Sequence, residues 1–359
     1  MALEKLTIVI PTHERHNLLM RSMEYYNNFN NNFIIVDSSQ TAFPDKIPDK
    51  FKYLHMPMED FGKKIYSTLS YVNTEYSCLC ADDDFLSESG LIECLSFLEN
   101  NDDYVSAQGR YISFNGVNKK LTAYPMYTKV LNHTVNSENK VERIEQAFNP
   151  YMHQIYAAHK TNILVKAFSV VSTVKNTSPV ELAVPLVGSI YGKHKMLPVF
   201  WMARDQLVYT SLINEKGRVQ RKNIFNEEEA CVSRVVIDWK SYLLSEDGKL
   251  FKNNYCEVIS EVVSDKNEQC SLFNTAFAVY LSKFVNDNSK YKASLNIKIK
   301  MIVKKLIPNY LLHIYRIARD ASFRYKHRLG YPWSNEEASN DWEKMKEIIL
   351  KHREKVRSK

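Results

Sequence analysis

The stretch YSCLCADDDF, residues 76–85, joins an apolar run to three consecutive aspartates. Its first half alternates bulky and small residues, which is typical of a strand buried beneath other layers. Three carboxylates at the end of such a strand repel one another, and a hard divalent cation would relieve that repulsion while keeping positions open for substrate phosphates. The stretch therefore predicts a metal-held site for a phosphorylated or nucleotide-linked substrate. Its alternative is a solvated acidic turn that caps the next helix.

The segments around this stretch alternate between strand and helix patterns. Further strands are predicted at residues 6–10, 33–36 and 52–55. The first strand is expected to stop at Pro11, and Thr12 is expected to cap the helix that follows it. Later helices are predicted at 63–72 and 89–100.

This β-α-β-α order predicts an α/β fold with a mostly parallel sheet flanked by helices. In such sheets ligands bind outside the carboxyl ends of the strands. Pro11, Thr12, Asp37 and residues 82–84 all follow predicted strands at this edge. Their common position favours a functional site over a simple acidic turn.

The composition limits how a nucleotide is held and where the protein works. None of the nine glycines forms a GxGxxG or GxxxxGK motif, so no glycine-rich loop cradles phosphates. The six cysteines lack the spacing of a zinc site, which indicates core thiols in a reducing compartment. No signal peptide is predicted, and no apolar run reaches the roughly 18 residues of a membrane span. We expect a cytoplasmic protein.

The net charge of +7 is unevenly distributed along the chain. Residues 289–359 contain 18 Lys and Arg against 7 Asp and Glu, whereas the rest of the chain contains 30 against 34. Between 289 and 330 the basic residues are interleaved with apolar ones, as in an amphipathic helix. Such a helix binds an anionic membrane surface, here the inner face of the cytoplasmic membrane. The alternative is that its apolar face packs on the rest of the protein.

Two regions are predicted from the change in pattern along the chain. Strand and helix patterns alternate within residues 1–215, and helical spacing dominates residues 216–359. The first region holds the aspartate stretch, so we expect it to be the catalytic domain.

Several motifs together resemble a known family. LTIVIPTHER, FIIVDSS and YSCLCADDDF occur in this order, and ELAVPLVGSIYGKHKMLPVFWMARD follows them. The chain resembles an inverting nucleotide-sugar glycosyltransferase of the GT-A fold, family 2 type, over about residues 5–210. It looks most like a bacterial subgroup associated with surface-polysaccharide synthesis. The resemblance implies that residues 1–215 form a GT-A catalytic domain.

The resemblance also implies the residues of the donor pocket. The nucleotide pocket would be lined by Pro11, Thr12 and Arg15, with Asp37 reaching the base or ribose. Lys63 or Lys64 would approach the diphosphate, since an ammonium suits phosphate as a point charge. The alternatives are a turn-forming Asp37 and two solvated lysines at a helix start.

Asp82 and Asp84 resemble the two ends of the DXD motif, with Asp83 between them at the donor. Asp84 would bind Mg²⁺ or Mn²⁺ directly, and Asp82 would contact the ribose or the metal. Arg204 would clamp the diphosphate. Asp205 falls where relatives often carry a metal-binding His, and it is either a further metal ligand or a member of a surface ion pair.

Glu181 corresponds to the acidic pair that supplies the catalytic base in this family. An inverting transfer needs one carboxylate that deprotonates the acceptor hydroxyl as it attacks the anomeric carbon. Here Leu182 follows Glu181 in place of a second acid, so a first-turn helix charge is the alternative.

The predicted function is a metal-dependent, inverting glycosyltransferase of bacterial surface-polysaccharide synthesis. It would move a sugar from a nucleotide-sugar donor to a hydroxyl of a glycan or a lipid-linked acceptor. One alternative is a catalytically inactive scaffold subunit that binds sugar nucleotides. The other is a metal-dependent protein that acts on nucleic acid. No recognised nucleic-acid-binding motif occurs, so no such partner is expected.

Overall fold

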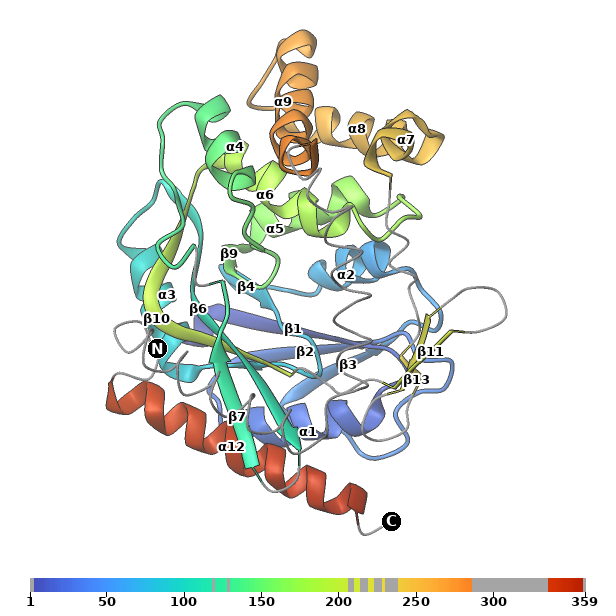
Figure 1. Cartoon of the computed structure of the whole chain (residues 1–359), viewed down its shortest axis with the longest axis vertical. Helices are drawn as coiled ribbons and strands as arrows, with labels where there is room; N and C mark the ends of the chain where they lie inside the picture. The colour runs from blue at the N-terminus through green and yellow to red at the C-terminus, as the bar shows by residue number, and fades with distance from the viewer. Residues whose placement is uncertain are drawn as a thin grey trace, which may run out of the picture.

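The structure is a computed structural model, and it describes residues 3–117, 120–127, 130–205, 210–213, 219–222, 228–229, 238–285 and 335–357. A ten-stranded mixed sheet forms its centre, with the strand order β3-β2-β1-β4-β9-β6-β10-β5 (Figure 1). Helices cover both faces of this sheet. The predicted α/β fold with helices flanking a central sheet is confirmed.

The first half of the sheet is parallel. All four strands are short; β1 and β2 are rich in β-branched residues, and β3 and β4 each begin with an aromatic residue. They are β1 (Leu6–Thr12), β2 (Asn32–Asp37), β3 (Phe51–His55) and β4 (Tyr76–Leu79). The helices that connect or follow them are α1 (His16–Tyr26), α2 (Phe61–Leu69) and α3 (Glu88–Glu99).

The second half mixes directions. β6 and β10 run parallel to each other, whereas β9 is antiparallel to both β4 and β6, and β5 is antiparallel to β10. β7 pairs with β6, and β8 pairs with β10. The strands are β5 (Phe85–Leu86), β6 (Tyr104–Val117), β7 (Lys120–Pro125), β8 (Thr134–Val135), β9 (Ala158–Lys160) and β10 (Lys193–Asp205).

Successive side chains of β1 point to opposite faces of the sheet, and each face carries its own hydrophobic core. Ile8 and Ile10 contribute to the core beneath α1 and α3, and Val9 contributes to the core on the opposite face. The first core is completed by α12 (Glu336–Arg357), which packs on α1 and α3. The second is built with α2 and with the helices α4 (Lys140–Phe148), α5 (Thr161–Val171), α6 (Val180–Tyr191), α7 (Trp239–Leu244), α8 (Glu246–Ile259) and α9 (Lys266–Val285).

Two local predictions at the end of β1 are wrong. The strand continues through Pro11 to Thr12, because β4 pairs with β1 only as far as Val9 and the missing N–H of Pro11 costs no ladder bond there. Thr12 does not cap α1, whose N-cap is Arg15. The Thr12 hydroxyl instead donates to Asp82.

The region after residue 215 begins with short strands and continues as helices. β12 (Val219–Lys222) lies between β11 (Thr210–Ile213) and β13 (Glu228–Glu229) in a small antiparallel sheet. The boundary at 215 stays a prediction. The basic segment 289–330, with the helix predicted within it, lies outside the described residues. In the part of the chain that is described, no helix has the length and apolar character needed to cross a membrane.

Candidate active site

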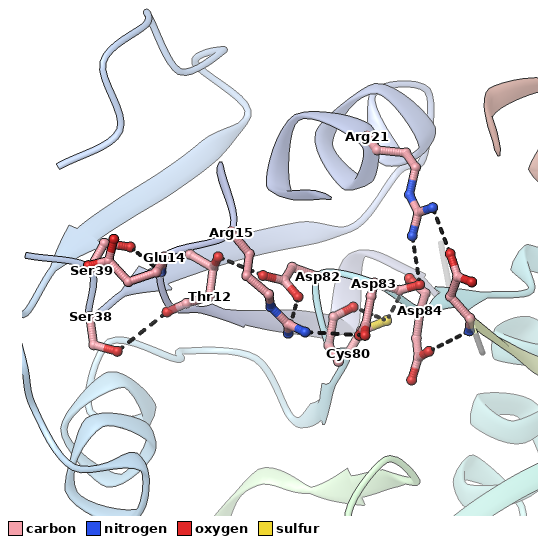
Figure 2. A network of polar contacts seen from close by, with 12 residues as sticks. Thr12, Glu14, Arg15, Arg21, Ser38, Ser39, Cys80, Asp82, Asp83 and Asp84 are labelled. Carbon is pink, nitrogen blue, oxygen red and sulfur yellow. Dashed lines mark hydrogen bonds and ion pairs between the residues drawn. The ribbon is translucent and has the colours of Figure 1, made fainter. Parts of the chain in front are cut away.

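Strand register brings the sequence-predicted residues to one edge of the sheet. Thr12 pairs with Asp37 at the ends of β1 and β2, and Val9 of β1 pairs with Leu79 at the end of β4. The three aspartates follow β4, so they lie beside Thr12 (Figure 2). The edge predicted from the sequence is therefore formed by the carboxyl ends of β2, β1 and β4.

Asp37 lies at the outer end of this edge and is fully buried. Its Oδ2 accepts a hydrogen bond from Tyr53 Oη and lies 2.8 Å from His16 Nε2, and its Oδ1 accepts from the Ser39 amide at 2.7 Å. Burial raises the pKa of the Asp37 carboxyl, but the hydrogen bonds from Ser39, Tyr53 and His16 outweigh it and lower the pKa overall. Asp37 is thus an ionised acceptor at neutral pH.

Lys63 and Lys64 are adjacent in helix α2 but differ in burial. Lys63 is exposed and pairs with Glu59, one turn earlier. Lys64 is buried, and its Nζ donates to Thr12 O at 3.0 Å and to Ser38 Oγ at 2.8 Å. Burial lowers the pKa of Lys64 to about 8, against the nearby carboxylates of Asp82 and Asp37. Only Lys64 joins the edge.

Asp82 accepts hydrogen bonds from the end of β1 and from the loop that follows β1. Thr12 Oγ1 donates to Asp82 Oδ2 at 2.6 Å, and Arg15 donates to Asp82 Oδ1 and, at 3.3 Å, to Asp83 Oδ2 (Figure 2). Asp82 is fully buried. Burial raises the pKa of the Asp82 carboxyl, while Arg15 and Thr12 oppose that rise.

Asp84 connects β4 to the end of β10. Its Oδ2 accepts from Arg204 Nε at 3.1 Å, and its Oδ1 accepts from the Asp205 amide at 3.0 Å. The antiparallel pairing of Phe85 with Ala203 sets this contact. Burial raises the pKa of the Asp84 carboxyl in spite of Arg204. The Asp84 charge holds the pKa of Arg204 above its usual value although burial opposes this, so Arg204 stays cationic.

Asp205 turns away from this group. Its side chain is fully buried, with Oδ2 accepting from Arg21 Nη1 at 2.8 Å and Oδ1 lying 3.5 Å from Arg353 Nη2. Arg21 also donates to the Asp83 carbonyl at 2.9 Å. The structure therefore gives Asp205 a buried ion-pair role and does not bring its carboxylate to Asp84.

Two of these carboxylates fit a hard divalent cation. Asp82 and Asp84 are buried oxygen donors whose charged forms are costly without added positive charge. Asp205 does not fit, since both of its oxygens face guanidinium groups. Across the described residues, no group of three or more His, Cys, Asp or Glu side chains is preassembled around a metal position.

Glu181 lies in the first turn of α6, on the side of the site formed by aromatic residues. Its Oε2 is 3.2 Å from His153 Nδ1, and its carbonyl accepts from Tyr151 Oη at 3.1 Å. The rings of Tyr127 and His153 are 5.8 Å apart, and Tyr127 Oη lies 3.5 Å from Arg204 Nη1. A chain of contacts thus leads from Glu181 through His153 and Tyr127 to the Arg204–Asp84 pair.

Several site residues were not predicted from the sequence. They share one feature, which is that their partners lie 16 or more residues away in the chain: His16, Arg21, Tyr53, Tyr127 and Arg353. Arg21 carried a usable signal, because it lies in α1 between the apolar Leu18 and Tyr25. A charged residue on an apolar helix face is buried only with a partner.

Comparisons with known proteins give structural matches alone. No family model and no curated protein matches the chain. The crystal structure of S. aureus TarS matches with a TM-score of 0.45 and 11% identity over 77% of this chain, and the match spans 54% of TarS, about half its length. A crystal structure of TarS residues 1–349 matches with a TM-score of 0.43 and 11% identity, over 80% of this chain and 91% of that fragment. The structure of the same fragment in complex with UDP-GlcNAc matches with a TM-score of 0.43 and 12% identity, over 80% of this chain and 92% of the fragment.

The function proposed below rests on the geometry of this chain's own site.

Replacing Asp205 distinguishes its ion-pair role from metal binding. Asp205→Asn should lower the free energy of unfolding by about 3–5 kcal/mol in EDTA, because it removes the carboxylate that pairs with the fully buried Arg21. Chemical denaturation measures this loss. Asp84→Asn is the matched control and should cost less, since the Arg204 side chain is 28% exposed and partly solvated. If the Asp205→Asn protein is as stable as wild type in EDTA, the ion-pair role of Asp205 is wrong and metal binding becomes the better assignment.

Proposed function

We propose that this protein is an inverting glycosyltransferase that uses a nucleotide-sugar donor and a divalent cation, Mg²⁺ or Mn²⁺. The observation that carries the proposal is the continuous edge from Asp37 through Thr12 and Asp82 to Asp84 and Arg204. Its ionised, buried Asp37 and its cations match the two ends of a nucleoside diphosphate. Glu181 lies across the aromatic side, where an acceptor would enter.

In the proposed donor complex, Asp37 accepts hydrogen bonds from the base or ribose, as a buried ionised carboxylate can. Lys64 and Arg15 lie next along the edge, and Arg204 follows at the sugar end. These side chains point fixed positive charge at the diphosphate, which lowers the free energy of the developing negative charge. Pro11 and Thr12 end β1 beside them, where Thr12 contacts both Lys64 and Asp82.

The chemical step is a displacement at the anomeric carbon. The Glu181 carboxylate takes the proton of the acceptor hydroxyl as that oxygen bonds to the anomeric carbon. The bond from this carbon to the phosphate oxygen breaks, its electron pair stays on that oxygen, and the nucleoside diphosphate leaves. Arg204 stabilises the leaving oxygen charge. A cation held by Asp82 and Asp84 would supply further charge neutralisation.

His153 supports the assignment of Glu181 as the base. Its Nδ1 lies 3.2 Å from Glu181 Oε2, so it can fix the orientation of the carboxylate. The buried Leu182 replaces the second acid of related sequences, and His153 supplies a polar neighbour to Glu181 instead. The inactive scaffold is the second candidate function, and measured turnover of a sugar nucleotide separates the two. UDP-GlcNAc, the ligand of one matched structure, is a practical first donor.

Asp84→Asn should remove cation-dependent nucleotide binding and transfer while the protein stays folded. The substitution keeps the size of the side chain but removes the charge that holds the cation. Calorimetric titration with UDP, GDP, CDP and ADP, with Mn²⁺ or with EDTA, measures binding, and circular dichroism checks the fold. Asp49→Asn is the control, because the Asp49 side chain is 95% exposed and lies 4.0 Å from Lys46, outside the edge. Near-normal turnover in Asp84→Asn would show that the metal site is elsewhere.

Glu181→Gln should lower the turnover rate by at least about 10²-fold, as expected for a lost general base, with donor affinity kept within about threefold. Glu142→Gln is the matched control, because Glu142 also lies in the first turn of a helix, α4. It separates loss of a base from loss of a favourable helix charge. A Glu181→Gln protein with normal turnover but weak donor binding would move the base to another residue.

We also propose that residues 289–330 bring the protein to an anionic membrane that carries a lipid-linked acceptor. The support is the sequence, with eleven Lys and Arg against one acid in this segment. Each basic residue near such a surface contributes about 1 kcal/mol of attraction. Flotation with liposomes should therefore recover the protein with anionic but not neutral lipid, and high salt should release it. Failure to float with anionic lipid at low salt contradicts membrane binding.

A further inference from the structure

The C-terminal helix α12 reaches the donor edge from the opposite end of the chain. It packs along α1 and α3 beneath the sheet (Figure 1). Lys351 and His352 both contact Glu24 of α1, and the Trp342 ring lies 6.1 Å from Phe114 of β6. The helix is therefore fixed by charged and aromatic contacts as well as by its apolar face.

One buried carboxylate of α12 holds the chain just beyond the aspartates. Asp341 is only 4% exposed, and its Oδ2 accepts from Ser87 Oγ at 2.6 Å, from Ser89 N at 2.9 Å and from Ser89 Oγ at 2.7 Å. Ser87 is the N-cap of α3 and follows β5 directly. Because β5 begins immediately after Asp84, Asp341 fixes the far end of the aspartate turn.

A second side chain of α12, Arg353, acts on the Asp83–Asp84 part of the same turn. Arg353 pairs with Asp205, which also holds Arg21. The Asp205 amide donates to Asp84 Oδ1. Arg21 donates to the Asp83 carbonyl (Figure 2). Arg353 therefore stabilises the two groups that set the position of the Asp83–Asp84 peptide and of the Asp84 carboxylate.

We infer that α12 is part of the donor site, with Asp341 and Arg353 as positioning residues for the Asp82–Asp84 turn. This inference rests on the proposed function, because it assigns α12 a role in nucleotide binding. Neither residue touches the donor. Both act by holding the backbone and the Asp84 oxygens in the geometry that a cation and a diphosphate require, and a small displacement of such ligands costs affinity.

The test measures binding of UDP, GDP, CDP and ADP with Mn²⁺ to the full-length protein by calorimetry at 10 °C. Arg353→Gln and Asp341→Asn should each weaken the tightest of these nucleotides by about tenfold, and Arg353→Lys should restore affinity to within about threefold. Lys351→Gln, on the same helix, is the control and should bind as wild type, since Lys351 pairs with Glu24 of α1 and not with the aspartate turn. Wild-type affinity in folded Arg353→Gln and Asp341→Asn proteins overturns the inference and leaves the proposed function intact. No binding of any nucleotide by the wild type overturns both.

A second measurement needs no variant. If the packing of α12 raises the affinity for the nucleotide, then binding of the nucleotide must stabilise the packing of α12 by the same free energy. Hydrogen exchange of the wild-type protein should therefore slow in peptides covering 338–353 when the tightest nucleotide and Mn²⁺ are added, with no change in α8 as the control helix. Unchanged exchange in 338–353, with protection at residues 80–86, overturns the inference even if the variants fail to fold.

Discussion

The structure depends on the compensation of buried carboxylates at one edge of the sheet. Four aspartates there are essentially inaccessible to solvent, and each is matched by donors from another part of the chain. An unpaired buried carboxylate costs several kcal/mol, so this matching constrains how the strands, α1 and α12 come together. The four are Asp37, Asp82, Asp84 and Asp205. The cations that pair with these carboxylates, such as Arg15 and Arg204, lie where a diphosphate would bind under the proposed function.

Charge balance links the two ligands of the proposed site. Three cations, Arg15, Lys64 and Arg204, lie among four carboxylates, so the edge carries little net charge before any ligand arrives. A nucleoside diphosphate brings several negative charges into this buried place, where their mutual repulsion is weakly screened. A divalent cation arriving with it offsets that charge and lowers the cost of ionising Asp82 and Asp84. Under the proposed function, donor and metal affinities are therefore coupled.

Local pattern and strand order are the features that the sequence makes predictable. β1, β2 and β4 follow from their apolar runs, and the parallel order of these strands is enough to place Thr12, Asp37 and the aspartates at one edge. The contacts that orient the site could not be predicted, because Arg21 and Arg353 meet Asp205 across 184 and 148 residues. No periodicity encodes such pairs. Asp205 shows the consequence, since its position in the sequence left a metal ligand and a surface ion pair open, whereas its contacts make it the centre of a buried ion cluster.

The two sides of the site differ in burial, and this difference suits their proposed roles. The carboxylates of Asp82 and Asp84 are buried and paired with guanidinium groups, which would keep a fixed, weakly hydrated field around a bound diphosphate. Glu181 is 39% exposed and bordered by the half-buried rings of Tyr127 and His153. A base must meet a hydroxyl that enters from outside, and aromatic faces can pack against a sugar while leaving room for it. Under the proposed function, the rigid charge on one side would bind the donor firmly and the open aromatic rim on the other would admit the acceptor.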